Sequence, residues 1–440
     1  MTGSLRRTLG LRDLILIVVG TVIGSGIFIV PATVLRQTDG AIALSLLVWL
    51  VAGVLSLLGA LTYGELGASK PDAGGLYVFI RDAFGALPAF LYGWTSFFVL
   101  GSGAVAALAV AFTQYLRQFI SVSPLGAKIA AVLMIFVVMV INVRGTRQGA
   151  NVQNWSTGLK TGAIVVMSIL LLAMGRGFSL PETHAWPAEA GPSLIAGLGL
   201  AMIAVLWAYE GWHYVTFSAG ETHDAQRIFP RGIILGTAIV IAIYLLANVA
   251  YVAALGATRA AASERVAADA VSALLGAGAG KAIAAVILVS MFSSANGVTL
   301  TVPRLYYSMA RDGVFFAKLA EVHPRFGTPA FAIIVSSLWA MVLAASGTFE
   351  QLLTYVVFVG FIFYGLGAMA IFTYRRREPN AARPFKVPAY PITPILFVAS
   401  AAAIVVNTIL TQPARAAVGI GFVLLGLPAY YAWRFSRRRK

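Results

Sequence analysis

The sequence predicts an all-α integral membrane protein with about twelve transmembrane helices, and three observations support this. Of the 440 residues 59% are apolar and only 11% are charged, a composition that excludes a soluble globular protein. Segments of about 20 apolar residues, the length that crosses a bilayer, fill nearly the whole chain. Two of these segments are interrupted by glycine, at Gly24-Ser25-Gly26 and at Glu210-Gly211. The mean hydropathy of +0.86 agrees with this class.

The apolar segments follow one another with short loops between them. No loop is long or polar enough for a separate soluble domain, so residues 1–440 are predicted to form one membrane domain. The expected spans are 11–36, 41–67, 83–118, 125–143, 152–175, 193–222, 231–256, 277–309, 328–346, 350–373, 391–411 and 415–434.

The order of the spans suggests two halves of five helices, 11–175 and 193–373, followed by two additional helices at 391–434. Each half opens with an interrupted helix. An odd number of spans per half gives the two halves opposite orientations, so that both first helices meet near the midplane of the membrane. We therefore expect a 5+5 inverted repeat with discontinuous first and sixth helices.

The first interruption predicts an anion site. A helix that restarts at Gly26 and Ile27 leaves unpaired N–H groups and the positive end of its dipole in the gap. These groups suit a carboxylate, and the Ser25 hydroxyl adds a donor. Glycine is common in membrane helices, and a single interruption is more often without function. Two interruptions in corresponding positions point to the binding site of a transporter.

Both interruptions also leave helix C-termini in the gap. The half-helices ending near Val22 and near Trp207–Glu210 are expected to present unpaired carbonyls, which suit an ammonium group. Donors for a carboxylate beside acceptors for an ammonium match the backbone of an α-amino acid.

Four ionisable residues are predicted near membrane depth, where they are costly and therefore functional candidates: Glu65, Lys160, Glu210 and Glu221. Glu65 and Glu221 lie near cytoplasmic helix ends, where gating or structural hydrogen bonding is expected. Lys160 either extends toward the interface or acts as a fixed cation among carbonyls. Glu210 lies in the second interruption, where it selects substrate, carries a proton or points into a wet vestibule without contact.

The basic residues predict the orientation. With the N-terminus inside, 23 of the 32 Lys and Arg residues fall on the cytoplasmic side, eight fall outside and Lys160 lies within a span. This pattern places both termini in the cytoplasm. The net charge of +16 therefore does not indicate nucleic-acid binding, and contact of the basic tail 437–440 with anionic lipid is an additional possibility.

Other kinds of site have little support in the sequence. The four histidines lack metal-ligand spacing, and no hydrolase motif occurs, so neither a metal, a cofactor nor an enzymatic activity is expected. The chain has no cysteine, so a disulfide-linked partner subunit is excluded.

The chain resembles the amino acid–polyamine–organocation (APC) superfamily over its full length, and within it bacterial members of the L-amino acid transporter (LAT) subfamily. The segments that carry the resemblance are GTVIGSGIFIVPA at 20–32, YGELGASKPDAGGLYVFIRDAFG at 63–85, WAYEGWHYVTFSAGET at 207–222 and SSANGVTLTVPRLYYSMARDGVF at 293–315.

The resemblance implies a site and a location. It implies that the backbone around Ser25, Gly26 and Ile27 holds an amino acid carboxylate, and that carbonyls of Val22, Trp207 and Glu210 meet its ammonium. It places Trp207, His213 and Tyr244 at the gate and pocket, and Lys160 where sodium binds in sodium-coupled relatives of this fold. It also implies a bacterial plasma membrane protein that works by alternating access.

The sequence departs from the family pattern at several positions that bear on specificity, and one of them is Glu210, whose counterpart varies in the family and is acidic in some members that accept cationic amino acids. Trp207 stands where phenylalanine is common, which indicates a smaller pocket, and His213 and Thr216 stand where asparagine is often found. The function expected from these features is sodium-independent transport, with exchange favoured, of small neutral L-amino acids. The alternatives are a transporter of cationic amino acids or polyamines, a proton-coupled symporter and, with less support, an amino acid sensor that does not transport.

Overall fold

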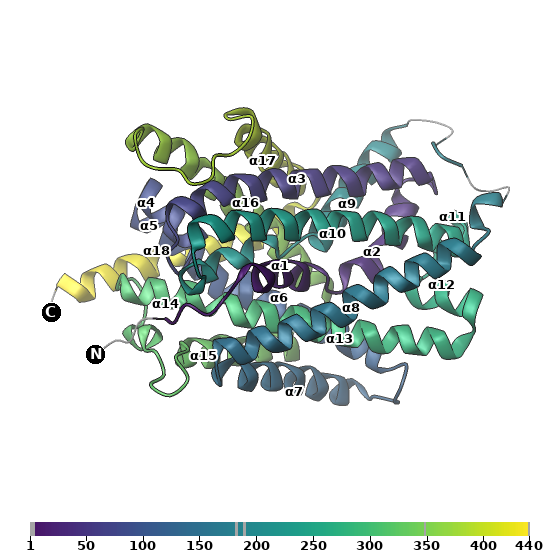
Figure 1. Ribbon diagram of the computed structural model, residues 1–440, viewed down its shortest axis with the longest axis horizontal. Helices are drawn as coiled ribbons and strands as arrows, with labels where there is room; N and C mark the ends of the chain where they lie inside the picture. Colours follow the sequence, from purple (N-terminus) through teal and green to yellow (C-terminus); the bar gives the residue numbers. More distant parts are fainter. Residues whose placement is uncertain (1–4, 181–183, 188–190, 347–348, 439–440) are drawn as a thin grey trace.

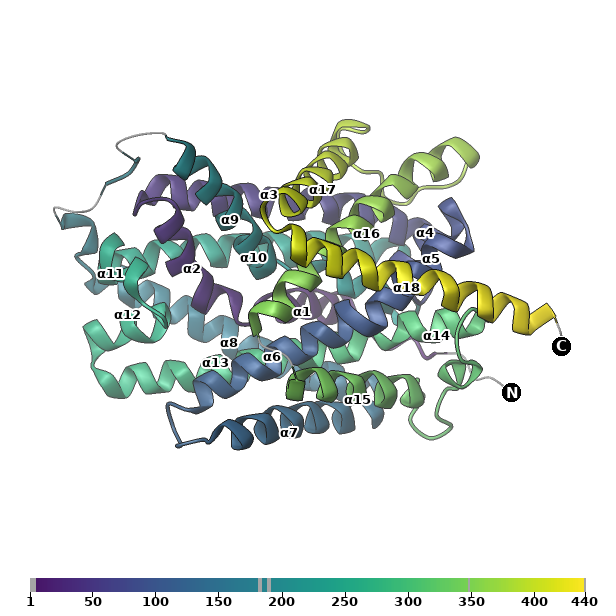
Figure 2. The same cartoon turned by 180° about the vertical axis from the view of Figure 1, so that it is seen from behind.

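The computed structural model describes residues 5–180, 184–187, 191–346 and 349–438, and in these ranges the chain is almost entirely helical. The only β-type pairing within them is an isolated parallel bridge between Leu9 and Thr222. The prediction of an all-α protein is confirmed. The long helices run roughly along one direction and form a bundle, with both termini at the same end in both views (Figures 1 and 2).

Each of the twelve predicted spans falls on an apolar helix or on helices that follow one another directly. The first half contains α1 (Leu11–Val22), α2 (Gly26–Gln37), α3 (Ile42–Ser69), α4 (Leu76–Phe84), α5 (Ala86–Thr95), the π-helical turn η1 (Ser96–Leu100), α6 (Gly101–Leu116), α7 (Pro124–Val143) and α8 (Thr146–Met174). The 3₁₀ turn η2 (Gly177–Ser179) follows.

The second half begins with α9 (Pro192–Ala208) and a 3₁₀ run, η3 (Trp212–Glu221). The remaining helices are α10 (Ala225–Leu255), α11 (Ala257–Ala262), α12 (Val266–Leu275), α13 (Ala277–Thr301), α14 (Pro303–Arg311), η4 (Ala317–Ala320), α15 (Ala330–Ser346), α16 (Phe349–Arg377), α17 (Ile392–Thr411) and α18 (Pro413–Arg438).

Ten stretches of helix within the described residues are long and apolar enough to cross a membrane. Three of them combine successive elements, α5 to α6, α9 with η3, and α13 with α14, and the bent pair of α1 and α2 makes an eleventh span. The remaining predicted span is α15, an apolar helix of 17 residues. The protein is thus a multi-pass membrane protein, and its helices account for every predicted span.

The first helix is interrupted at the predicted position. α1 ends at Val22, α2 begins at Gly26, and the two axes differ by 47°. Gly26 permits the close approach of the second half, because a Cβ there would lie 2.6 Å from both the Cα and the Cβ of Ala208. The first break therefore packs directly against the end of α9.

The sixth helix is also interrupted as predicted, but it restarts differently. Gly211 has φ +120°, a left-handed conformation that favours glycine, and a Cβ there would lie 3.0 Å from the carbonyl carbon of Thr21. The segment after it is the 3₁₀ run η3 and not an α-helix. The Thr21 hydroxyl donates to the Gly211 carbonyl at 3.1 Å, which joins the two breaks by a hydrogen bond.

Candidate functional site

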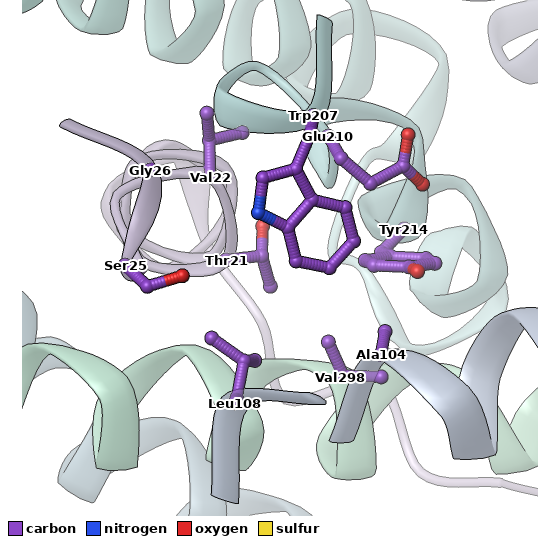
Figure 3. Close-up of a pocket in the computed structure, with 11 residues that line it drawn as sticks. Thr21, Val22, Ser25, Gly26, Ala104, Leu108, Trp207, Glu210, Tyr214 and Val298 are labelled. Carbon is purple, nitrogen blue, oxygen red and sulfur yellow. The ribbon is translucent and has the colours of Figure 1, made fainter. Parts of the chain in front are cut away.

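A small pocket lies between the two breaks. It is lined by residues of both interrupted helices and by two further helices, α6 and α13: Thr21, Val22, Gly24, Ser25, Gly26, Ala104, Leu108, Trp207, Glu210, Tyr214 and Val298. In Figure 3 the indole of Trp207 lies between the first break and Tyr214, with Ala104, Leu108 and Val298 along another side. The cavity has a volume of about 30 Å³, which leaves room for about two waters.

The start of α2 presents unused donors to this region. Among the described residues, no hydrogen bond is recorded from the backbone N–H groups of Ser25, Gly26 and Ile27. The Ser25 hydroxyl is buried and has no hydrogen-bond partner among the described residues. Buried donors are nearly always paired in a folded protein, so this cluster of unpaired donors marks a place where a ligand oxygen fits. Ser25 and Gly26 line the pocket, whereas Ile27 does not.

Two of the three predicted carbonyls, those of Val22 and Trp207, already accept hydrogen bonds in this conformation, contrary to the expectation that they are unpaired. The Val22 carbonyl accepts from the Gly24 N–H at 2.8 Å and from the Tyr244 hydroxyl at 3.0 Å. The Trp207 carbonyl accepts from the Glu210 N–H at 3.0 Å. Helix C-termini buried inside a protein acquire such partners because an unpaired carbonyl is costly. An ammonium at Val22 therefore has to replace one of these donors.

The Glu210 side chain lines the pocket and is 7% exposed. The Tyr364 hydroxyl from α16 donates to Glu210 Oε1 at 2.6 Å. His213 Nδ1 lies 3.9 Å from the same oxygen. The carboxylate is therefore held by a hydroxyl donor, and it neither points into open solvent nor contacts a lysine or arginine among the described residues.

His213 and Tyr244 were expected at the gate and pocket, but the structure places both behind the pocket wall. His213 is buried against the rings of Tyr214 and Tyr364, with centroids 4.3 Å away in each case. Tyr244 donates its hydroxyl to the carbonyls of Val22 and Ala208, so it joins the two helix ends that frame the pocket. Both residues shape the site without lining it.

Lys160 of α8 is fully buried beside the first break, outside the pocket. Its Nζ donates to the carbonyls of Gly20 at 2.8 Å, Ile23 at 2.5 Å and Ser290 at 3.3 Å. Three backbone oxygens match the three donors of an ammonium group. Of the two alternatives for Lys160, the structure shows the lysine among carbonyls, where it ties α8 and α13 to the end of α1.

The two other candidate carboxylates form ion pairs at the end of the bundle that carries the termini. Glu221 and Arg304 are both fully buried, with Arg304 Nε 2.6 Å from Glu221 Oε2, and the Thr146 hydroxyl donates to Glu221 at 2.8 Å. Glu65 accepts from Arg375 at 2.7 and 2.8 Å and from the Val387 N–H at 2.6 Å. Neither carboxylate lines the pocket.

A third polar cluster at this end joins α4 to the end of α14. Asp312 accepts from the Tyr77 hydroxyl at 2.8 Å and from Arg81 at 2.5 Å. Burial, with the neighbouring Asp312 carboxylate, raises the pKa of the Tyr77 hydroxyl, which therefore stays protonated and donates. The sequence did not single out Arg304, Tyr364 or Asp312, because each pairs with a residue far away in the chain.

Comparison with known proteins identifies the family. A profile described as amino acid permease matches residues 9–429. The chain belongs to the amino acid permease family. The resemblance to the APC superfamily and its LAT-type members is thereby confirmed. Within the described residues no group of three or more His, Cys, Asp or Glu is placed to hold a metal ion.

Several curated relatives match this permease over nearly its full length. It is 31% identical to the serine/threonine exchanger SteT of Bacillus subtilis, covering 98% of both chains. It is 34% identical to the human cystine/glutamate transporter, over 97% of this chain and 85% of the relative. It is 31% identical to the mouse large neutral amino acids transporter small subunit 2, over 97% and 81%. All three relatives are transporters of amino acids by name, and their substrates differ.

Proposed function

We propose that this protein transports small neutral L-amino acids by sodium-independent exchange and alternating access. The observation that carries the proposal is the cluster of unpaired donors at the start of α2, beside a small pocket lined by both broken helices. The three N–H groups and the Ser25 hydroxyl are suited to a carboxylate at a helix N-terminus. In the proposal, carbonyls of Val22, Trp207 and Glu210 receive the ammonium, with the Tyr244 hydroxyl giving way at Val22.

The pocket supports a small substrate. The Trp207 indole occupies its centre in Figure 3, and the remaining space holds about two waters. The Glu210 carboxylate is engaged by Tyr364, which supports a neutral side chain over a cationic one. The similarity to a serine/threonine exchanger points in the same direction, whereas the other relatives carry larger or charged substrates by name.

Lys160 supports sodium independence. A cation would compete for the carbonyls of Gly20, Ile23 and Ser290, which the lysine already occupies. Sodium prefers oxygen ligands of this kind, so the lysine and a sodium ion exclude each other. In the proposal, Lys160 takes the place of sodium permanently and stabilises the end of α1.

We further propose that the protein lies in a bacterial plasma membrane with both termini in the cytoplasm. The termini share one end of the bundle, and 23 of 32 basic residues are assigned to that side. Without cysteine, no disulfide can join the chain to a partner subunit, and in the proposal it works alone.

A second candidate function rests on Glu210. A buried carboxylate that lines the pocket can pair with the distal charge of a cationic amino acid or polyamine, or bind a transported proton. Replacing Glu210 by Gln abolishes arginine binding if the first of these is correct. It abolishes acceleration of uptake by an inward proton gradient if the second is correct.

The decisive experiment is uptake of radiolabelled L-alanine into sodium-free proteoliposomes, with and without unlabelled L-alanine inside. We expect strong stimulation by internal alanine, inhibition by external serine and weak inhibition by leucine or phenylalanine. Inhibition by leucine or phenylalanine as strong as that by serine would overturn the size limit on the substrate. A requirement for sodium would overturn the proposed role of Lys160. Binding of alanine without any uptake would indicate a sensor. No uptake or binding of alanine would direct the next assay to arginine.

A further inference from the structure

A second and much larger cavity opens on the outside of the bundle. It has a volume of about 880 Å³ and lies on α8, beside the first part of α1 and the second half of α13. These three helices pack against one another (Figure 1). We call this cavity the α8 groove. Its lining residues include none of those around the pocket between the breaks, so it is a separate place on the molecule.

One end of the α8 groove is basic. Arg12 and Arg147 line it, and both side chains are exposed. Arg12 makes no ion pair among the described residues, and Arg147 pairs only with Asp13, at 3.0 Å, while its side chain remains 55% exposed. Two arginines at the end of the bundle that carries the termini can receive a phosphate, which arginine binds with its planar fork of donors.

The rest of the α8 groove is apolar and exposed. Trp155 is 82% exposed and Leu159 is 57% exposed, and Phe292 of α13 lines the same cavity. Trp155 and Leu159 follow Arg147 by eight and twelve residues along α8. At about 1.5 Å per residue they lie ~12 and ~18 Å from it, which matches the ~15 Å depth of one leaflet.

We propose that the α8 groove binds one anionic phospholipid of the leaflet on the side of the termini. The phosphate lies at Arg12 and Arg147, and an acyl chain lies along Trp155, Gly158 and Leu159. The two arginines are accompanied by one carboxylate, that of Asp13, so the site keeps a net positive charge. This charge favours an anionic headgroup over a zwitterionic one. Gly158 keeps the path open, because a Cβ at this position would have no atom within 4 Å.

The bound lipid would also touch the first broken helix. Arg147 pairs with Asp13 of α1, and the Asn154 side chain donates to the same carboxylate at 2.6 Å. A phosphate at Arg147 therefore adjoins the contact that fixes the start of α1 on α8. This inference depends only on the placement of the chain in a membrane, and it holds whichever amino acid is transported.

The test is quenching of Trp155 fluorescence by brominated lipid. The full-length protein is placed in phosphatidylcholine vesicles that contain an equal minor fraction of brominated phosphatidylglycerol or brominated phosphatidylcholine. The Trp155 signal is the difference between the wild type and Trp155→Phe. We expect brominated phosphatidylglycerol to quench Trp155 more strongly than brominated phosphatidylcholine does. Arg12→Gln should lower the ratio of the two quenching efficiencies about fivefold, as expected for the loss of one surface arginine.

Two matched controls keep the test specific. Arg144→Gln removes an exposed charge near the same helix end but outside the groove, and it should leave the preference unchanged. Gly158→Leu fills the groove and should abolish quenching, while Gly162→Leu, one turn further on and equally free of neighbours, should not. The two glycine variants gain the same helix propensity, so a difference between them reports the groove.

Three outcomes would overturn the proposal. Equal quenching by both brominated lipids would show a nonspecific lipid surface. If the variant that carries both Arg12→Gln and Arg147→Gln kept the preference for brominated phosphatidylglycerol, the two arginines would not bind the headgroup. Absence of quenching that is restored by diluting the protein in the membrane would show that a second copy of the chain covers the groove.

Discussion

At the residue scale, the meaning of Glu210 depends on its partner. The sequence identifies an acidic residue in the second break, but three roles for it remain open at that level. The structure adds the Tyr364 hydroxyl at 2.6 Å, contributed by a helix 154 residues away. Sequence patterns report neighbours along one helix, and they carry no information on such a distant pair. The same reason explains why Arg304, which neutralises Glu221, was not predicted.

We expect Tyr364→Phe to widen the specificity toward cationic amino acids. The substitution removes the hydrogen bond that engages Glu210 and leaves a buried carboxylate facing the pocket. A hydrogen bond to a charged group contributes about 1.5–3 kcal/mol, so L-lysine should inhibit alanine uptake about tenfold more strongly. The measurement is competition against radiolabelled alanine in proteoliposomes.

Tyr209→Phe is the matched control for this variant. Tyr209 lies in the same break, and its buried hydroxyl has no hydrogen-bond partner among the described residues. This variant should leave lysine inhibition unchanged. A lysine response that is unaltered in Tyr364→Phe would show that the tyrosine does not mask Glu210.

At the element scale, the sequence located both breaks but not their geometry. The glycines mark where each helix cannot continue, and both interruptions occur within one or two residues of the predicted places. The sequence did not show that the segment after Gly211 is a 3₁₀ run, nor that Gly85 ends α4 and Val302 separates α13 from α14. Hydropathy is averaged over a window of many residues, so it locates a span but does not show where a helix ends within it.

The contact between the breaks gives a prediction for Gly26→Ala. The added methyl group would lie 2.6 Å from the backbone and side chain of Ala208, so α2 and the end of α9 must separate. We expect alanine uptake to fall to background and folding stability to drop by about 1–3 kcal/mol, the usual cost of overpacking. The measurements are proteoliposome uptake and thermal unfolding in detergent.

Gly278→Ala provides the comparison, because a Cβ at Gly278 in α13 has nothing within 4 Å. It should keep wild-type uptake and gain slightly in stability through its helix propensity. Wild-type uptake by Gly26→Ala would mean that the close approach of the two breaks is not needed for transport.

At the scale of the whole molecule, the packing supports the proposed inverted repeat. Spans in equivalent positions of the two predicted halves pack against each other: the first and sixth spans through α2 and α9, and then α3 with α10, α6 with α13 and α7 with α15. Pairing of equivalent helices is expected around a pseudo-twofold axis. Sequence similarity between the halves is weak, so the sequence could suggest the repeat only from the two breaks. The packed pairs therefore support the repeat at four of the five span positions in each half.

The orientation in the membrane follows from charge and gives the last prediction. Because the chain has no cysteine, single introduced cysteines can be labelled without background. Arg144 and Glu264 are exposed, and they lie in connections assigned to opposite sides of the membrane. A membrane-impermeant maleimide should label Glu264→Cys in intact cells, and Arg144→Cys only after the membrane is opened. The reverse pattern would place the termini outside, and it would move the α8 groove lipid to the outer leaflet, where anionic headgroups have to be available for the site to fill.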